Sequence, residues 1–304
     1  MAAAVPLTSA TPLSRAMAEI AEVIDRRFDQ FLPIPADARA NLYACMRHAA
    51  IGGGKRLRPL LVCAVADLHA VSREASERVA AAVEAIHVYS LVHDDLPAMD
   101  DDDLRHGKPT AHKAFGEATA ILAGDCLHAL AFEWLADHDT HPDPSVRAEL
   151  VLALARASGP IGMAGGQALD LAAERVPMDL NGVTRLQQMK TGALIAVAVE
   201  MGATLARLPE QGRTGLRGYA HDLGLAFQIA DDLLDAEGDE DTAGKRLRKD
   251  AGAGKATFLS LLGPERAREQ CRMLTEQAVQ HLHAYGAEAD LLRALARYVV
   301  ERDR

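Results

Sequence analysis

The stretch HDDLPAMDDDD, residues 93–103, places six aspartates among eleven residues. Neighbouring carboxylates repel one another, so the stretch is either a solvated acidic loop or a site that metal ions neutralise. Asp94 is expected at the C-terminal end of a helix, because Pro97 disfavours a helical conformation at Leu96. The helix dipole opposes a carboxylate at that end unless a cation compensates. These residues alone leave both interpretations open.

A second acidic cluster lies in YAHDLGLAFQIADDLLD, residues 219–235. At 100° per residue its polar side chains form one stripe on an otherwise apolar helix, and the only basic group, His221, lies two turns or more away. Surface helices usually disperse such charges among lysines, so a solvated face is the weaker interpretation. Two such clusters favour an oxygen-rich cage for Mg²⁺, which commonly shares its ligands with substrate phosphates. The stripe consists of Gln228, Asp231, Asp232 and Asp235.

Basic segments accompany the acidic clusters and would suit bound phosphate. None of them is a P-loop, because GGGK lacks the spacing G-x-x-x-x-G-K-[ST]. Each segment alone is typical of solvated surface, but together they favour a diphosphate site. The segments are GGGKRLRP at 52–59, DLRHGKPT at 103–110, KTG at 190–192 and GKRLRKDAGAGKAT at 244–257.

Helices must position these side chains, because apolar residues recur at helical spacing along most of the chain. We expect an all-α fold in one domain over residues 15–304, preceded by a disordered terminus at 1–14, since no repeat or low-complexity linker divides the chain. The predicted helices cover residues 14–31, 36–50, 57–71, 73–95, 117–137, 145–163, 180–206, 213–236, 255–262, 264–285 and 288–301.

Composition limits the partners and the compartment. A formal net charge of −10 argues against nucleic acid, which demands a broad basic surface. The longest apolar run, 192–206, contains Glu200 and is shorter than the roughly 20 residues of a membrane span. The first residues lack the pattern of a signal peptide, and the four cysteines have no metal-ligand spacing. We therefore expect a cytoplasmic protein without a membrane span.

The motifs together resemble those of the trans-polyprenyl diphosphate synthases, from about Ala40 to the C-terminus. HDDLPAMDDDDLR resembles the first aspartate-rich motif in its bacterial form, and DDLLD resembles the second. GGKRLRP, GGQALDL, MKTGAL and FQIADD also resemble segments of the family, most closely those of the bacterial farnesyl diphosphate synthases. The resemblance implies a large single-domain helical bundle of the isoprenoid synthase type.

The resemblance also implies roles for individual residues. Three Mg²⁺ ions, for which Mn²⁺ can substitute, are expected on Asp94, Asp95, Asp100, Asp231 and Asp235. The allylic diphosphate is expected to contact Arg105, Lys190, Thr191, Gln228, Lys245 and Lys255. Isopentenyl diphosphate is expected to contact Lys55, Arg58, His87 and His106. Gln167 and Asp170 are expected to support these ligands.

Some of these assignments compete with simpler ones. His87 could instead be a buried, hydrogen-bonded helix residue, and Gln167 with Asp170 could be a polar helix end. His106 stands where the family commonly has a second arginine that helps to bind isopentenyl diphosphate. Either His106 substitutes for that arginine with a weaker, pH-dependent charge, or the affinity for isopentenyl diphosphate is lower.

The implied activity is the Mg²⁺-dependent condensation of isopentenyl diphosphate with dimethylallyl and geranyl diphosphate to farnesyl diphosphate. Geranylgeranyl diphosphate is the alternative product, and a non-catalytic subunit of a prenyltransferase is an alternative class, although such a subunit would be expected to lose aspartates. A terpene cyclase would not need Lys55, Arg58 and His87, and a phosphohydrolase built on His93 and Asp94 lacks partner histidines. A homodimer is expected from the resemblance and the apolar helices.

The length of the product is expected to depend on Tyr89 and Ser90. A tail attached to diphosphate at Asp94 would run back along its helix, and five residues span about 7.5 Å. Helical periodicity puts Ser90 and not Tyr89 on the Asp94 stripe, so Tyr89 could be a core tyrosine. The resemblance implies that an aromatic residue five positions before the first aspartate limits the product to fifteen carbons.

Overall fold

Polar residues cap α4, which carries the first acidic cluster at its end, and the N-terminal helix α1. Thr11 begins α1 (Pro12–Phe31), and its side chain accepts a hydrogen bond from the backbone N–H of Ser14 at 3.1 Å. Ser72 begins α4 (Arg73–Asp94) in the same way, with the N–H of Ala75 at 3.3 Å. Such caps satisfy N–H groups that the first turn of a helix leaves unpaired.

The computed structural model describes residues 11–173, 177–237 and 256–301. Its described part is helical apart from one two-stranded hairpin and the connections, which confirms the predicted all-α class. The first ten residues of the predicted disordered terminus, 1–14, lie outside the described residues. Pro12, Leu13 and Ser14 belong to α1, so the helix begins earlier than the predicted domain boundary. The remaining elements are α2 (Ala40–Ala50), α3 (Leu57–Asp67), β1 (Leu104–Arg105), β2 (Lys108–Pro109), α5 (Ala111–Phe115), α6 (Glu117–Ala136), α7 (Pro144–Ser158), α8 (Met163–Ala173), α9 (Leu180–Gln187), η1 (Gln188–Gly192), α10 (Ala193–Leu205), α11 (Glu210–Glu237), α14 (Phe258–Leu262), α15 (Pro264–His281), η2 (Ala287–Ala289) and α16 (Asp290–Glu301).

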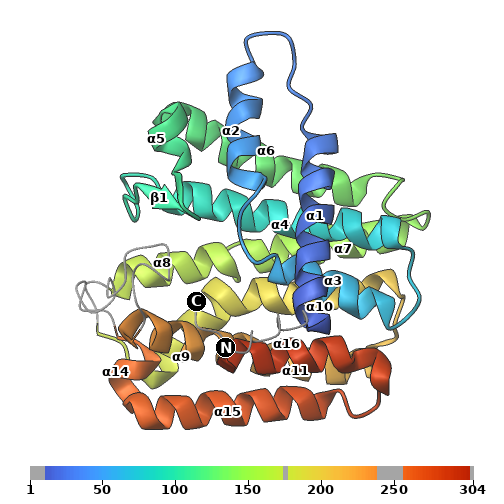
Figure 1. Cartoon of the computed structure of the whole chain (residues 1–304), viewed down its shortest axis with the longest axis vertical. Helices are drawn as coiled ribbons and strands as arrows, with labels where there is room; N and C mark the ends of the chain where they lie inside the picture. The colour runs from blue at the N-terminus through green and yellow to red at the C-terminus, as the bar shows by residue number, and fades with distance from the viewer. Residues whose placement is uncertain (1–10, 174–176, 238–255, 302–304) are drawn as a thin grey trace, which may run out of the picture.

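The core lies between helices that run side by side. In Figure 1, α4, α8, α11 and α15 cross the molecule in roughly the same direction, while α1 and α2 stand across them. Most side chains of α10 are buried, and this helix packs against α3, α4, α7 and α11. Helix α4 packs against α3 and α6, and α11 packs against α15. The apolar helices of the sequence are therefore the interior of one bundle.

The largest difference from the predicted elements concerns the segment 180–206, which was expected to be one helix. In the structure α9 and α10 are joined by the π-helical turn η1, which carries Lys190 and Thr191. Such turns insert a residue into a helix and often occur at functional sites. Hydrophobic periodicity does not predict them, because the apolar pattern continues on either side.

Three further elements are absent from the prediction. The β1–β2 hairpin lies within DLRHGKPT, α5 follows that motif, and α8 contains GGQALDL. Neither glycine-containing motif shows sustained helical periodicity. The predicted helix 145–163 ends earlier, at Ser158, because Gly159 and Pro160 follow it.

Within the described residues, α6 is the one helix whose length and hydropathy would allow it to cross a bilayer. This test is weak, because a core helix of a globular domain meets the same criteria. Helix α6 packs against α2, α4, α5 and α7, and its residues Ala120, Leu127 and Leu135 are fully buried.

Candidate active site

The first acidic motif folds back on the end of its helix. Asp94 is the last residue of α4, as predicted. The backbone N–H of Asp100 donates to the carbonyl oxygen of Asp94 at 2.8 Å, and that of Asp101 donates to Leu96 at 3.2 Å. Asp101 has a φ of 48°, a left-handed conformation that aspartate adopts more readily than most residues. The turn therefore returns Asp100 to Asp94.

The carboxyl group of Asp94 is held in an environment that disfavours its charge. Burial is the main cause and raises the pKa of Asp94 to about 6, with a further contribution from Asp100. Lys190 opposes this increase. A cation bound beside Asp94 would therefore stabilise the charged form of its carboxyl group.

Asp95 has a cationic partner within the protein. The guanidinium of Arg105 donates to Asp95 Oδ1, with Nε at 3.0 Å and Nη2 on the same oxygen. Arg105 belongs to the β1–β2 hairpin, whose turn residues His106 and Gly107 have φ values of 52° and 75°. Positive φ at both central residues is typical of tight hairpin turns. The hairpin thus directs Arg105 to the acidic loop.

The neighbouring aspartates of the second acidic stripe, Asp231 and Asp232, have different surroundings on α11. Asp232 is buried and accepts hydrogen bonds from Gln228 Nε2 at 3.0 Å and from the backbone N–H of Phe258 at 2.8 Å. The bond from Phe258 joins α11 to α14. Asp231 instead lines the cavity that also contains Asp94. Gln228 also contacts the π-helical turn, because its Oε1 accepts a hydrogen bond from Thr191 Oγ1 at 3.0 Å.

The π-helical turn brings Lys190 to the acidic clusters. Lys190 Nζ lies 2.6 Å from Asp170 Oδ2 on α8. The backbone of the turn lies directly against Gly166, where a Cβ atom would be 2.2 Å from Lys190 N. Only glycine permits this approach, so α8 sets the position of Lys190 by close backbone contact and by one ion pair.

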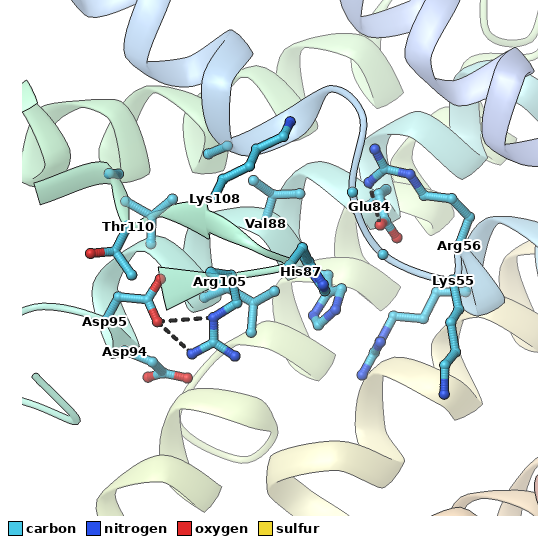
Figure 2. Close-up of a pocket in the computed structure, with 18 of the residues that line it drawn as sticks. Lys55, Arg56, Glu84, His87, Val88, Asp94, Asp95, Arg105, Lys108 and Thr110 are labelled. Atoms are coloured by element: carbon cyan, nitrogen blue, oxygen red, sulfur yellow. Dashed lines mark hydrogen bonds and ion pairs between the residues drawn. The ribbon is translucent and has the colours of Figure 1, made fainter. Parts of the chain in front are cut away.

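Both acidic clusters and the basic segments 52–59, 103–110 and 190–192 meet in one cavity of about 610 Å³, whereas most of the segment 244–257 falls outside the described residues. Figure 2 shows Asp94 and Asp95 on one side of it and Lys55 on the other, with Arg105 and His87 between them. The predicted residues that line it are Lys55, Arg58, His87, Asp94, Asp95, Asp100, Arg105, His106, Lys190, Thr191, Gln228 and Asp231.

The cationic side of the cavity contains two groups whose charge is disfavoured by burial. Burial lowers the pKa of Arg58, and its Nε atom is buried without a hydrogen-bond partner among the described residues. Burial also lowers the pKa of His87 well below its usual value, and Arg58 contributes in the same direction. His87 is therefore a neutral imidazole at pH 7. An anion in the cavity would supply the charge and the acceptor that these groups lack.

His106 lies against the glycine loop that precedes Lys55. A Cβ atom on Gly53 would be 3.1 Å from His106 Cδ2, and one on Gly54 would be 3.6 Å from His106 Nε2. His106 is itself exposed, which suits a side chain at the mouth of the cavity.

The acidic clusters fit a metal that a ligand helps to hold. Among the described residues, no three His, Cys, Asp or Glu side chains converge closely enough to bind an ion alone. Carboxylate oxygens from α4 and α11 nevertheless line the same cavity, and oxygen ligands suit Mg²⁺. Diphosphate oxygens could complete the coordination there.

A smaller cavity of about 280 Å³ adjoins the first and shares Arg58, His87, Asp94 and Lys190 with it. Tyr89 and Ser90 both line it, although the helical wheel favoured Ser90 alone. The Tyr89 ring packs edge-on against the rings of His93 and His128, with centroids 5.8 and 5.0 Å away. Gln167 also lines this cavity, and its Nε2 atom is buried with no hydrogen-bond partner among the described residues.

Some predicted residues are not brought to either cavity, and some lining residues were not predicted. Asp235 lies one turn beyond Asp231 on α11 and does not line the main cavity. Lys245 and Lys255 fall outside the described residues. Sequence reasoning missed Arg56, Glu84, Lys108 and Thr110, all of which line the main cavity. Arg56 and Lys108 were inside the quoted basic motifs, and Glu84 was visible as a charge within an apolar helix.

Comparisons with known proteins agree on one family. The family model described as polyprenyl synthetase matches residues 39–296. Farnesyl diphosphate synthase of Escherichia coli (strain K12) is 49% identical over 85% of this chain and 88% of its own length, and that of Bacillus subtilis (strain 168) is 41% identical over 88% and 90%. A solved apo structure of an FPP/GFPP synthase from Zymomonas mobilis is 56% identical, covers 96% of this chain and 100% of that one, and superposes with a TM-score of 0.89.

Proposed function

The chain belongs to the polyprenyl synthetase family and is a trans-prenyltransferase, and we propose that it condenses isopentenyl diphosphate with dimethylallyl and then geranyl diphosphate to give farnesyl diphosphate. The observation that carries this proposal is the shared cavity, in which a carboxylate side and a separate cationic side face each other. Two diphosphates in one site require both.

The carboxylate side would hold the allylic diphosphate through metal ions. We assign Asp94, Asp95 and Asp100 to two Mg²⁺ ions and Asp231 with Asp235 to a third, with Mn²⁺ as a substitute. The assignment of Asp235, which does not line the main cavity, rests on the family resemblance alone. When bound, these ions would stabilise the charge that develops on the departing diphosphate. Asp95 already pairs with Arg105, so its role includes holding that guanidinium in place.

The protein's own cations would assist the same step. Asp170 and Gly166 hold Lys190 at the acidic side of the cavity, through an ion pair and a close backbone contact. Asp95 holds Arg105 there through hydrogen bonds. Both would donate hydrogen bonds to the leaving diphosphate as the allylic C–O bond ionises. Lys245 and Lys255 are assigned to this diphosphate from the family resemblance alone.

The cationic side would hold isopentenyl diphosphate. Lys55 and Arg58 would meet its diphosphate, and neutral His87 would donate a hydrogen bond to it. The double bond of this substrate would then attack the allylic carbocation, and the product would form when a proton is lost to the released diphosphate. Apolar walls, including Val88, Leu91 and Phe227, would keep water from the cation.

Two alternative classes fit the site less well. A terpene cyclase binds one diphosphate and would not need the cationic side with its partly buried Arg58, whose Nε atom is buried. A non-catalytic partner subunit would not be expected to retain carboxylates from both α4 and α11 in one cavity.

A product of fifteen carbons is supported by the smaller cavity beside Asp94. Tyr89 lines it and is held edge-on by His93 and His128, so its ring would limit the length of the tail. The two bacterial relatives named above are farnesyl diphosphate synthases. Geranylgeranyl diphosphate is the alternative product, which a longer tail path would allow.

We also propose a cytoplasmic homodimer. Ile121 and Leu122 on α6 and Leu152 on α7 are large apolar side chains with 44%, 54% and 50% of their surface exposed, and these two helices pack against each other. A second copy would cover such a surface. All four cysteines are free of disulfides, as a reducing compartment would require.

The experiment that tests the proposed function compares acceptors. Purified protein, Mg²⁺ and labelled isopentenyl diphosphate are combined in turn with dimethylallyl, geranyl or farnesyl diphosphate. We expect turnover with the first two and little with the third. Incorporation of label with none of the acceptors would refute the activity, and equal turnover with farnesyl diphosphate would favour the longer product.

A further inference from the structure

We propose that Arg56 is a positioning residue for the site of isopentenyl diphosphate, which it builds without contacting the substrate. The inference rests on the proposed function and adds a residue to that same site. Arg56 lies between Lys55 and Arg58 in the chain, and only 4% of its surface is exposed. A buried guanidinium is costly unless carboxylates and hydrogen-bond acceptors compensate its charge, so the role of Arg56 follows from the groups that it contacts.

The guanidinium of Arg56 joins three segments of the bundle. Nη1 donates to Glu84 Oε1 on α4 at 2.8 Å, and Nη2 donates to Asp25 Oδ1 on α1 at 2.8 Å and to the carbonyl oxygen of Ala50 at 2.5 Å. Asp25 Oδ2 also accepts from the backbone N–H of Gly52 at 3.0 Å. The network thereby holds both ends of the glycine loop that carries Lys55.

The same contacts exclude Arg56 as a substrate ligand. Its charge is matched by Glu84, which is also buried, and by Asp25. Figure 2 shows the Arg56 guanidinium turned to Glu84 while the Lys55 side chain extends in the opposite direction. A diphosphate near Lys55 would therefore meet Lys55 and not Arg56.

The backbone conformation at Arg56 links the hydrogen bonds of its side chain to the positions of Lys55 and Arg58. Arg56 has a φ of 52°, an uncommon left-handed conformation for a residue other than glycine, and its carbonyl oxygen accepts the first hydrogen bond of α3, from Leu60 at 3.0 Å. This conformation turns the chain between Lys55, which precedes it, and Arg58, in the first turn of α3. Loss of the side-chain contacts would let both cations move.

Glu84 extends the network to the third predicted ligand. It lies three residues before His87 on α4, so the two side chains share one face of the helix. One buried ion pair thus ties the segment of Lys55 and Arg58 to the helix of His87. Arg56 therefore fixes the positions of Lys55, Arg58 and His87 relative to one another.

Two variants and one control test this role. Arg56→Lys keeps the charge but cannot reproduce the planar fork that reaches Glu84, Asp25 and Ala50 at once. Arg56→Met with Glu84→Met removes the buried pair and leaves only Asp25, whose side chain is 31% exposed to water, without its cationic partner. The control is Arg213→Lys, because Arg213 is equally buried and bound to Glu149 and Glu200 but does not line the main cavity.

KM for isopentenyl diphosphate and KM for geranyl diphosphate are measured separately, with circular dichroism to check folding. We expect both Arg56 variants to raise KM for isopentenyl diphosphate about tenfold, since small misplacements of binding groups have effects of this order or larger. KM for geranyl diphosphate should stay within about twofold in the same variants, because its ligands lie on other elements. Arg213→Lys should leave both KM values unchanged, whatever it does to the melting temperature.

The outcomes separate this inference from the proposed function. If the wild-type protein condenses the substrates and a folded Arg56 variant keeps the wild-type KM for isopentenyl diphosphate, only the positioning role is refuted. An equal increase in both KM values, or loss of the fold in both variants, would assign Arg56 to general stability and overturn it as well. Failure of the wild-type protein to condense them would refute the function itself.

Discussion

At the scale of single residues, burial disfavours the charged form of Asp94 unless a cation lies beside it. Burial raises the pKa of Asp94 to about 6, so the folded chain binds the proton of this group more tightly than the unfolded chain does. The contribution of Asp94 to stability is therefore most favourable below the unfolded pKa of about 4, falls as pH rises through about 6, and stays at its lowest value above that.

Asp94→Asn should remove this destabilisation together with the activity. At pH 7.5 without metal, the variant should be more stable than the wild type by about 2 to 3 kcal/mol at most, because a shift of one pKa unit corresponds to about 1.4 kcal/mol. At pH 4 the two should be equally stable. Urea unfolding at both pH values measures this, with Asp101→Asn, an exposed carboxylate, as the control. A variant less stable than the wild type at pH 7.5 would contradict the account.

Tyr89→Ala should lengthen the product. Removing the ring would enlarge the cavity beside Asp94 and take away the contacts with His93 and His128, leaving room for about one more isoprene unit. Mass spectrometry of the products should show a shift from fifteen to twenty carbons or more. If a folded, active variant makes the wild-type product, Tyr89 does not limit the tail.

The residue types of this site could be predicted from the sequence, but their partners could not. Asp231 and Asp232 are identical neighbours on the same stripe, yet one lines the cavity and the other holds the start of α14. That difference depends on a segment 26 residues away. The sequence likewise did not indicate the role of Arg56, because its partners come from three separate segments of the chain.

At the scale of elements, the π-helical turn η1 is the part most specific to function. Helical periodicity predicted one continuous helix, and the same residues form two helices joined where Lys190 and Thr191 face the cavity. Close packing against Gly166 of α8 leaves no space for a side chain. The long apolar helices were predictable because burial alone determines their pattern, whereas α8 and the hairpin depend on specific contacts with other elements of the bundle.

Gly166→Ala should displace the turn. A Cβ atom would meet Lys190 N at 2.2 Å, so the backbone must move, at a cost of about 1 to 3 kcal/mol of stability for overpacking. KM for the allylic substrate should rise, because Lys190 moves with the turn. Gly192→Ala is the matched control in η1, since its Cβ would be 3.5 Å from the nearest atom. Equal kinetics for the two variants would argue against a role of the close contact.

At the scale of the whole molecule, the exposed apolar side chains of α6 and α7 predict a dimer. Leu122→Glu should give a folded monomer, because this side chain is half exposed in the single chain and is not part of its core. Ile34→Glu is the control, since Ile34 is equally exposed but lies outside these helices. Sedimentation velocity at micromolar concentration distinguishes the species. A wild-type protein that sediments as a monomer would rule out the proposed assembly.

The bundle brings together groups from Lys55 to Asp231, and the central claim is that these groups join two diphosphate substrates into a fifteen-carbon product. The most direct measurement is the mass of the product formed from isopentenyl and dimethylallyl diphosphate with Mg²⁺. We expect farnesyl diphosphate as the main product and no condensation when excess chelator removes the metal. The absence of any prenyl diphosphate longer than the substrates, or condensation that continues in chelator, would refute the proposed function.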